Sequence, residues 1–574
     1  MGYGLGHALV GRRLAAALAP ELVLTAGLVG LSWGLALLSF GLSIGPGVQI
    51  GISALAGLYA GWRWWQAPAT ARAQWAGRLL APLCGPGRLA LAALLLVFGA
   101  LVLVHAGQPP IFPDSALYHA QTVQWAQRYP VVPGLGNLHG RLAFNSHLHL
   151  LTAFFSASPQ PQHPAWQQAL GSFWFLLLVS YCARQVAQTW ARPVGQSGGQ
   201  TATASAMPPT LTIYYLGSVV LIFVGYRPWI SSPMPDSGVA LLTLLLLGWV
   251  LEKLTAAGPA GRFTRAEMGL LAGLLAAAIT YKVSAGCLVL PLGYAAWQRR
   301  PIDKPNAGHW LGRAALTGAL VLVPWLGRNV VLSGYLVYPL APWAQLPVDW
   351  RVPAGQLAFD LREIRDFARW PGSGWEAVAA MRPGAWLPYW WSQQYPGDRR
   401  LLLFVLGVAG SVGLARWWWR PEADERRLHG LFFLLLGCCA AWFGAAPAFR
   451  FGYAYLIGSA LVGSWLLLRK LPGKLVRALC LIISLAYGLN GLRHEIPNSK
   501  LITWWWPADY PLLPTTVVLV QGRPVRVAGA GTNGRCGNCP VPCAADPPPA
   551  DIYWRGAGLA QGFRRGAGVA TAQQ

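Results

Sequence analysis

The sequence predicts an all-α transmembrane helical bundle with long loops on one side of the membrane and a small C-terminal tail. The chain has 574 residues, of which 55% are hydrophobic and 11% are charged, whereas soluble domains carry about 25% charged residues. It also contains 30 Trp, and indole rings favour the membrane–water interface. These few charges cannot cover a chain of this length with polar surface. We therefore expect a polytopic protein that contacts membrane lipid.

Apolar stretches predict about 13 spans, because a helix needs about 20 residues to cross the hydrocarbon core. We divide 267–298 into two spans at Lys282, since an unpaired ammonium group in mid-membrane costs several kcal/mol. The candidate spans are 22–41, 46–62, 89–106, 166–186, 210–226, 238–254, 267–281, 284–298, 313–332, 400–415, 429–446, 453–468 and 475–492.

The distribution of Arg and Lys predicts the orientation of the chain. Basic residues gather in alternate short connections, and such connections face the cytoplasm. The N-terminus is then cytoplasmic, and the C-terminus lies outside a bacterial inner (cytoplasmic) membrane. The chain has a net charge of +25. Nucleic acid is not an expected partner, because the basic residues gather in short clusters between apolar stretches. The basic connections are 63–88, 253–266, 299–313, 416–427 and 469–477.

The spans divide the chain into six parts. N-terminal helices occupy 1–106, central helices 166–332 and the last helices 400–492. The parts predicted outside the membrane are a first long loop at 107–165, a second long loop at 333–399 and a tail at 493–574.

The first long loop begins with a candidate catalytic carboxylate. Pro113 and Asp114 are typical of a helix start, where the carboxylate either caps free N–H groups or stays available for chemistry. Tyr118 would lie one turn later on the same face, beside His119. A short amphipathic helix on the membrane surface fits this segment.

The same loop continues with Val132–Ser146, which is rich in Gly, Pro and Asn and therefore predicts a shaped loop. His139 and Arg141 suit the binding of a phosphate, and Asn137 and Asn145 are further candidate substrate-binding residues. Six of the ten His fall between 105 and 163, so a His-bound metal is an alternative use of this region.

Ionisable residues also stand at the predicted outer ends of several spans. Each one alone is explained by capping or snorkelling. Two carboxylates and three cations at one membrane face together predict a polar pocket, since such groups are usually paired or functional. The residues are Asp114, Asp236, Lys282, Arg328 and Arg450, with Tyr335 shortly after Arg328.

The second long loop carries alternating charges. They indicate either a segment that closes over a bound substrate or the solvated face of a helix. The charged residues are Asp349, Arg351, Asp360, Arg362, Glu363 and Arg365.

The tail contains three cysteines, Cys536, Cys539 and Cys543. An extracytoplasmic compartment is oxidising, so a disulfide is the expected use, with zinc as the alternative. The sequence leaves the pairing open, and Cys536 with Cys543 is one candidate. Val517–Val520 and Val525–Val527 predict two short strands around Gly522, so the tail is expected to be a small α+β or loop-rich cap.

An Asp early in the first long loop, a second acid in a later turn and an Arg near the last spans resemble the GT-C fold glycosyltransferases. The strings Val132–Ser146, Ser231–Asp236, Pro324–Asn329 and Ser333–Pro339 are similar to a set of largely uncharacterised bacterial multi-pass membrane proteins associated with them. This resemblance covers most of 110–565, including Gly562-Phe563-Arg564. One departure is that Ser follows Asp114, where many relatives have a second acid.

The resemblance implies transfer of a sugar from a polyprenyl-phosphate donor to a glycan, lipid or protein acceptor. Asp114 would be the general base, Asp236 would supply the second acid, and Arg450, Arg328 or Lys282 would stabilise the leaving phosphate. A divalent metal ion between Asp114 and Asp236 is an open option. The competing hypotheses are a transporter or flippase of lipid-linked glycans, a polymerase or ligase of surface polysaccharide, and a non-catalytic membrane scaffold.

Overall fold

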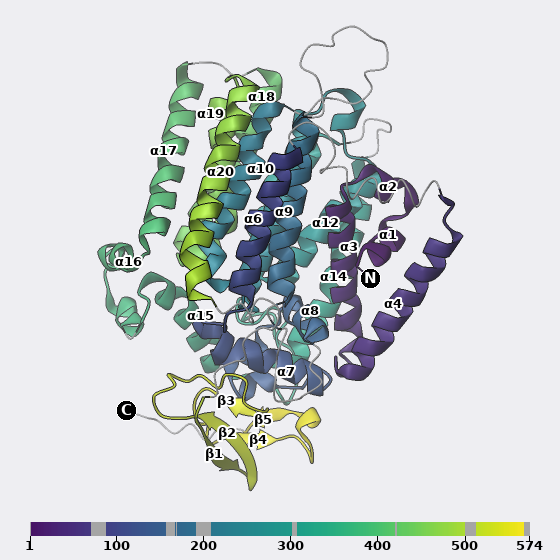
Figure 1. Ribbon diagram of the computed structural model, residues 1–574. Coiled ribbons are helices and arrows are strands. Elements are labelled where there is room, and N and C mark those ends of the chain that lie inside the picture. The colour runs from purple at the N-terminus through teal and green to yellow at the C-terminus, as the bar shows by residue number, and fades with distance from the viewer. Residues whose placement is uncertain are drawn as a thin grey trace.

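In the residues that it describes, the computed structural model is a helical bundle with five short strands beyond one end of it (Figure 1). We call this end the sheet end. The structure describes residues 2–69, 88–156, 167, 169–190, 208–300, 307–372, 374–418, 422–499 and 513–566. The connection at 191–209, whose Gly-, Ser-, Thr-, Pro- and Gln-rich composition predicts a low-complexity linker, lies largely outside these residues.

Eleven helices in the described ranges are long and apolar enough to cross a membrane, so the chain is a multi-pass membrane protein. They are α3 (Pro20–Leu38), α6 (Arg88–Ala106), α9 (Ala169–Trp190), α10 (Thr212–Tyr226), α11 (Pro235–Thr255), α12 (Arg265–Tyr281), α14 (Ala307–Ser333), α17 (Pro396–Trp418), α18 (Ala423–Ala445), α19 (Phe449–Leu468) and α20 (Gly473–Glu495).

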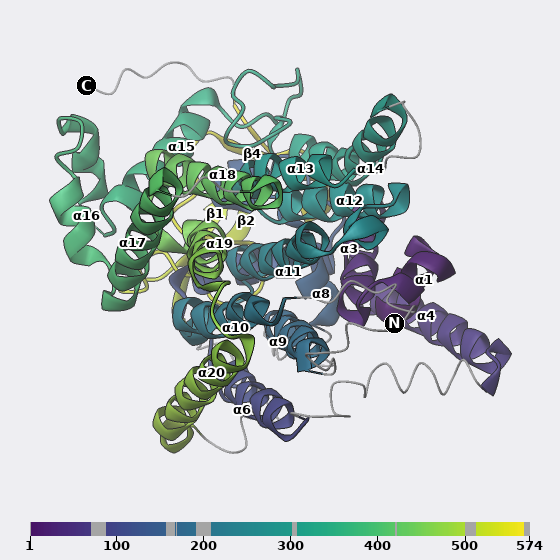
Figure 2. The same cartoon turned by 90° about the horizontal axis from the view of Figure 1, so that it is seen from above.

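The bundle has a buried centre and an apolar outer surface. Helices α11 and α19 are buried along most of their length, and seen from above they lie in the middle of the bundle (Figure 2). Helices α14, α17 and α20 are the least buried of the eleven. Large apolar side chains such as Leu320, Leu406 and Ile482 point outward from them, which is compatible with lipid contact.

Two of the 13 predicted spans are not among these eleven helices. Helix α4 (Pro46–Gln66) is long enough, but its glycines and glutamines lower its mean hydropathy. Helix α13 (Val289–Gln298) has 10 residues and follows a 3-10 segment, Val283–Leu288. The break in the helix at Lys282 is nevertheless confirmed. Helix α12 ends there, and the N–H of Phe263 donates to the carbonyl of Arg299 at 2.8 Å, so the chain doubles back.

The remaining helices are short. Helices α1 (Gly2–Val10) and α2 (Arg12–Ala17) precede α3, whereas α7 (Ala120–Arg128), α8 (His147–Phe155), α15 (Ala354–Arg369) and α16 (Leu387–Gln393) belong to the two long loops. In Figure 1, α7, α8 and α15 lie at the sheet end.

The two predicted strands are confirmed as an antiparallel hairpin, β1 (Thr515–Val520) and β2 (Arg523–Ala528). Gln521 and Gly522 connect them with positive φ angles of 51° and 77°, as a type I′ turn requires. The short strand β3 (Cys543–Ala544) pairs in parallel with β2, and β4 (Ile552–Trp554) pairs with β5 (Phe563–Arg565). The tail is therefore a small sheet-containing cap, as predicted.

The sheet end has a hydrophobic core of its own, separate from that of the bundle. It is built by the two long loops and the tail together, for example by Trp125, Leu135, Tyr338, Val525 and Phe563. Three segments far apart in the sequence thus share one core. The first loop therefore packs on a core to which the tail contributes side chains.

Two glycines mark where the tail meets the first loop. The N–H of Phe563 donates to the carbonyl of Pro133 at 3.0 Å. A Cβ on Gly562 would lie 1.9 Å from that carbonyl oxygen, and one on Gly134 would lie 2.1 Å from the carbonyl oxygen of Phe563. Both glycines have positive φ angles, so only glycine permits this approach.

Replacement of Gly562 by Ala should therefore loosen the tail. Both the clash with backbone and the φ of 84° disfavour a side chain there, and a strained backbone position costs about 1–3 kcal/mol. Limited proteolysis of the purified protein should cut the tail faster in the variant. Gly558→Ala is the matched control, because nothing lies within 4 Å of its Cβ position and its φ is −126°. Equal cleavage of both variants would contradict the expectation.

Candidate functional site

Asp114 lies in the helix that opens the first long loop, but it does not cap it. A π-helical turn, Ser115–His119, joins Asp114 to α7, and the Asp114 side chain makes no capping hydrogen bond. Its Oδ2 lies 3.3 Å from Nη2 of Arg450, in the first turn of α19. The helix was predicted correctly and the capping interpretation was wrong, because the carboxylate pairs with a cation from another helix.

Asp236 forms a second ion pair close by. Met234 is the N-cap of α11, and Asp236 lies in the first turn without a capping bond, so its predicted role as a cap was also wrong. Its carboxylate instead pairs with Lys282, at the end of α12. Asp236 is buried. Burial lowers the pKa of Lys282, and Asp236 opposes that shift.

Aromatic rings and serines join the two ion pairs into one site. Nζ of Lys282 lies 3.6 Å from the ring centre of Phe451, and the guanidinium carbon of Arg450 lies 4.9 Å from the same ring. Both distances suit cation–π attraction. The hydroxyl groups of Ser115 and Ser232 are 2.6 Å apart, which ties the first loop to the turn before Asp236. We call Asp114, Arg450, Asp236 and Lys282 the ion-pair cluster.

Tyr118 and Arg141 extend the cluster toward the second long loop. The guanidinium carbon of Arg141 lies 5.8 Å from the ring centre of Tyr118, and its Nη2 donates to Glu363 of α15 at 2.6 Å. Burial lowers the pKa of Arg141, but Asp114 and Glu363 outweigh it and leave that pKa above its usual value. Burial and then Asp114 raise the pKa of Tyr118, so its phenol stays neutral.

The acidic residues of α15 do not lie on a solvated face. Asp360 and Asp366 are buried, and Asp360 accepts hydrogen bonds from Tyr338 and Gln356. With Glu363 bound to Arg141, this helix is docked on the first loop. The interpretation as a solvated face was therefore wrong for Asp360, Glu363 and Asp366, whereas Arg362 and Arg365 are exposed.

Other predicted site residues hold the loops in shape. The Asn137 amide donates to the carbonyl of Trp350 at 2.8 Å, and the Tyr335 hydroxyl donates to the carbonyl of Val352 at 3.0 Å. His139 is the N-cap of a short 3-10 turn, Gly140–Ala143. Asn145 and Arg328 contact each other at 3.1 Å, in a separate cavity described below. The ion-pair cluster itself therefore contains fewer residues than predicted.

Three residues at the site were not predicted. The ring of His149 lies 4.9 Å from that of His119, Phe451 contacts both cations, and Glu363 binds Arg141. Phe451 follows Arg450 directly, so an aromatic neighbour was visible in the sequence. The sequence offers no signal that brings Glu363 or His149 to the site, because both depend on how the long loops fold together.

The ion-pair cluster does not fit a metal ion. Asp114 and Asp236 each already face a cation. Among the described residues, no group of three or more His, Cys, Asp or Glu side chains comes together to hold a metal. Hard divalent ions prefer several oxygen ligands, so we derive no chemistry through a metal here.

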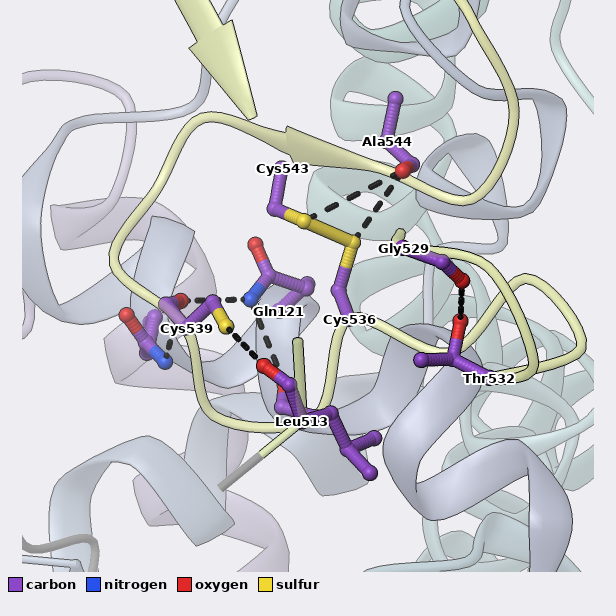
Figure 3. Close-up of a disulfide and its surroundings, with 10 residues drawn as sticks. Gln121, Leu513, Gly529, Thr532, Cys536, Cys539, Cys543 and Ala544 are labelled. Atoms are coloured by element: carbon purple, nitrogen blue, oxygen red, sulfur yellow. Dashed lines mark hydrogen bonds between the residues drawn. A yellow bond between two sulfur atoms is a disulfide. The ribbon is translucent and has the colours of Figure 1, made fainter. Parts of the chain in front are cut away.

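The tail covers the helix that carries the site. Cys536 and Cys543 form a disulfide, so this candidate pairing is confirmed. The loop between them contacts the π-helical turn and α7. The N–H of Gly537 donates to the carbonyl of Ala116 in that turn at 2.7 Å, and the Gln121 amide of α7 donates to the carbonyl of Cys539 at 2.7 Å (Figure 3). We had expected a short amphipathic helix on the membrane surface here. The helix is present as α7, but the tail covers it and most of its residues are buried.

Three buried histidines and the half-buried His139 predict a loss of stability in acid. Burial lowers the pKa of His139 and His149 to about 4, and it lowers the pKa of His119 and His147 well below the usual value. Unfolding would return each pKa to about 6.5, so below that pH the unfolded chain binds more protons. Stability is therefore complete above about pH 6.5 and is lost as the pH falls toward 4.

Thermal unfolding in detergent should show this effect between pH 7 and pH 5.5. Each histidine should contribute about 1 kcal/mol of destabilisation over that range. His139→Gln should reduce the pH dependence, whereas His494→Gln, at an exposed position, should leave it unchanged. A melting temperature that is constant over the range would contradict the expectation.

Comparison with known proteins identifies a family and no activity. A family model described as a domain of unknown function (DUF8201) matches residues 3–457. The chain belongs to this family. The matched range includes all four residues of the ion-pair cluster, and it ends before α20 and the tail. No curated protein and no solved structure matches the chain.

Proposed function

We propose that this protein is a membrane glycosyltransferase that moves a sugar from a polyprenyl-phosphate donor to an acceptor hydroxyl at the sheet end. The ion-pair cluster is the observation that carries the proposal. It places two carboxylates beside two cations where apolar helices meet polar loops. The resemblance to GT-C glycosyltransferases in the same residues supports it.

The sheet end faces the outside of a bacterial inner membrane in this proposal. Support comes from the opposite end of the bundle, where short connections carry many basic residues. Examples are Arg299-Arg300 after α13 and Lys470 and Lys474 between α19 and α20. Such short basic connections are typical of the cytoplasmic side.

Bond making and breaking can be assigned to named groups. The acceptor oxygen attacks the anomeric carbon of the sugar, and its proton passes to the carboxylate of Asp114. The bond between that carbon and the phosphate oxygen breaks, and the electron pair stays on the polyprenyl phosphate. Arg450 and Lys282 stabilise the charge that develops there. A phosphate that competes for Arg450 also frees Asp114 to act as the base.

The remaining groups position the reactants. Tyr118, held neutral by its buried site, is available as a hydrogen-bond donor. Arg141 is held by Glu363 at one edge of the cluster, and the buried rings of Phe112 and His119 lie at the other. An environment with little water strengthens each of these electrostatic contacts.

The proposal is tested with labelled polyprenyl-phosphate sugars. Membranes that contain the full-length protein are incubated with a panel of these donors and with a mixture of membrane and soluble acceptors. We expect one donor to be consumed, with release of free polyprenyl phosphate and label in an acceptor. If no donor is consumed, the glycosyltransferase proposal is wrong. If a donor crosses the membrane intact, the proposal is also wrong, and the protein is a transporter.

A further inference from the structure

Arg328 differs from Arg141, Lys282 and Arg450 because no carboxylate among the described residues compensates its charge. Arg450, Lys282 and Arg141 each pair with a carboxylate. Arg328 is 7% exposed, and it donates from Nε to Oδ1 of Asn145 at 3.1 Å and from Nη1 to the hydroxyl of Ser39. Both partners are neutral. Within the described part of the chain, no carboxylate pairs with Arg328, and its Nη2 makes no hydrogen bond.

This arginine lines a cavity beneath the first long loop. The walls come from the end of α3, from α7 and α8, from the loop around 130–146 and from α14. Polar groups on the walls include Ser39, Thr122, Asn145 and His149. None of the described lining residues is acidic. A buried guanidinium beside such a cavity is costly unless an anion joins it.

The cavity and the ion-pair cluster are separated by one layer of side chains. His149 lines the cavity, and its ring lies 4.9 Å from that of His119. Phe144 also lines it and lies 5.8 Å from Tyr118, ring centre to ring centre. A ligand in the cavity would thus sit next to the proposed catalytic residues without contacting the two ion pairs.

We infer that this cavity binds a phosphate group, free or as the headgroup of a lipid, with Arg328 as its positive charge. The need for an anion comes from Arg328 itself, and only the choice of phosphate rests on the proposed function. Guanidinium groups bind phosphate oxygens through two N–H donors, and Nη2 has both of its N–H groups unused. One uncompensated cation matches one negative charge on a phosphate group.

Equilibrium binding of two labelled probes to the full-length protein tests the inference. The probes are inorganic phosphate and a short-chain prenyl phosphate, each measured with wild type, Arg328→Gln and Arg328→Lys. We expect saturable binding by the wild type, a loss of at least about tenfold in Arg328→Gln and partial recovery in Arg328→Lys. Arg313→Gln is the matched control, since Arg313 is an exposed arginine on the same helix.

Binding of both probes would identify free phosphate as sufficient, and binding of the prenyl phosphate alone would identify a lipid headgroup. If the wild type binds neither, or if Arg328→Gln binds as tightly as the wild type, the inference is overturned. If Arg328→Gln fails to fold, Leu332→Phe tests the inference in its place. The larger side chain fills the cavity from its apolar wall, so binding of the probes should also weaken. Phosphate binding without donor consumption would defeat the proposed reaction and leave this site standing.

Discussion

Replacement of Asp114 by Asn should abolish sugar transfer while the protein remains folded and inserted. Asn keeps the size and one acceptor of the carboxylate, but it cannot take up a proton from the acceptor hydroxyl. Loss of a general base typically lowers a rate by about 10²–10⁴-fold. The measurement is donor consumption in membranes that contain equal amounts of wild type and variant.

A purely structural role for Asp114 is separated from catalysis by a double variant. Asp114→Asn leaves Arg450 without its partner at 3.3 Å, and Arg450→Gln in the same chain removes that uncompensated charge. Both thermal stability and activity should return in the double variant if the pair is only structural. Stability should return while activity stays lost if the pair takes part in the reaction, with Asp114 as the base and Arg450 on the phosphate. Asp349→Asn, which breaks the exposed pair with Arg555, should leave transfer unchanged.

The second large effect is expected on stability. Lys282→Met should destabilise the protein by about 3–5 kcal/mol, the usual cost of removing one partner from a buried ion pair. The variant leaves Asp236 buried among apolar groups with no cation against it. Thermal unfolding in detergent measures the change.

Removing both charges provides the decisive comparison. Asp236→Asn combined with Lys282→Met should recover most of the lost stability, because no uncompensated charge remains. Lys470→Met, at an exposed position, is the control for loss of a lysine and should be close to neutral. A single variant as stable as the wild type would contradict the expectation that Lys282 compensates the buried charge of Asp236.

The ion-pair cluster could be anticipated because charges at the ends of apolar helices must find partners. Asp114, Asp236, Lys282 and Arg450 were predicted to share a polar pocket, and the structure brings them together in two pairs. The partners of each residue were not predictable, since they come from helices distant in the sequence. The capping role expected for Asp114 and Asp236 failed for the same reason.

The sheet end was predictable only in part. The hairpin around Gly522 follows from local turn chemistry, which acts over a few residues. Asn137 and Tyr335 bind backbone carbonyls of the second loop, and no side-chain pattern reveals such partners. The pairing of Glu363 with Arg141 was equally hidden, because an alternating charge pattern looks the same on a solvated helix and on a docked one.

The shared core at the sheet end has a consequence for the order in which the protein matures. Residues 113–146 are synthesised early, but the β-strands and the disulfide loop that pack on them belong to the last part of the chain. At roughly 5–20 residues per second, ribosomes need tens of seconds to reach that part. The helix that bears Asp114 therefore lacks its contacts with the tail until translation is nearly complete. A chain that terminates after α20 would carry every predicted span and both ion pairs, yet lack the piece that locks its first loop.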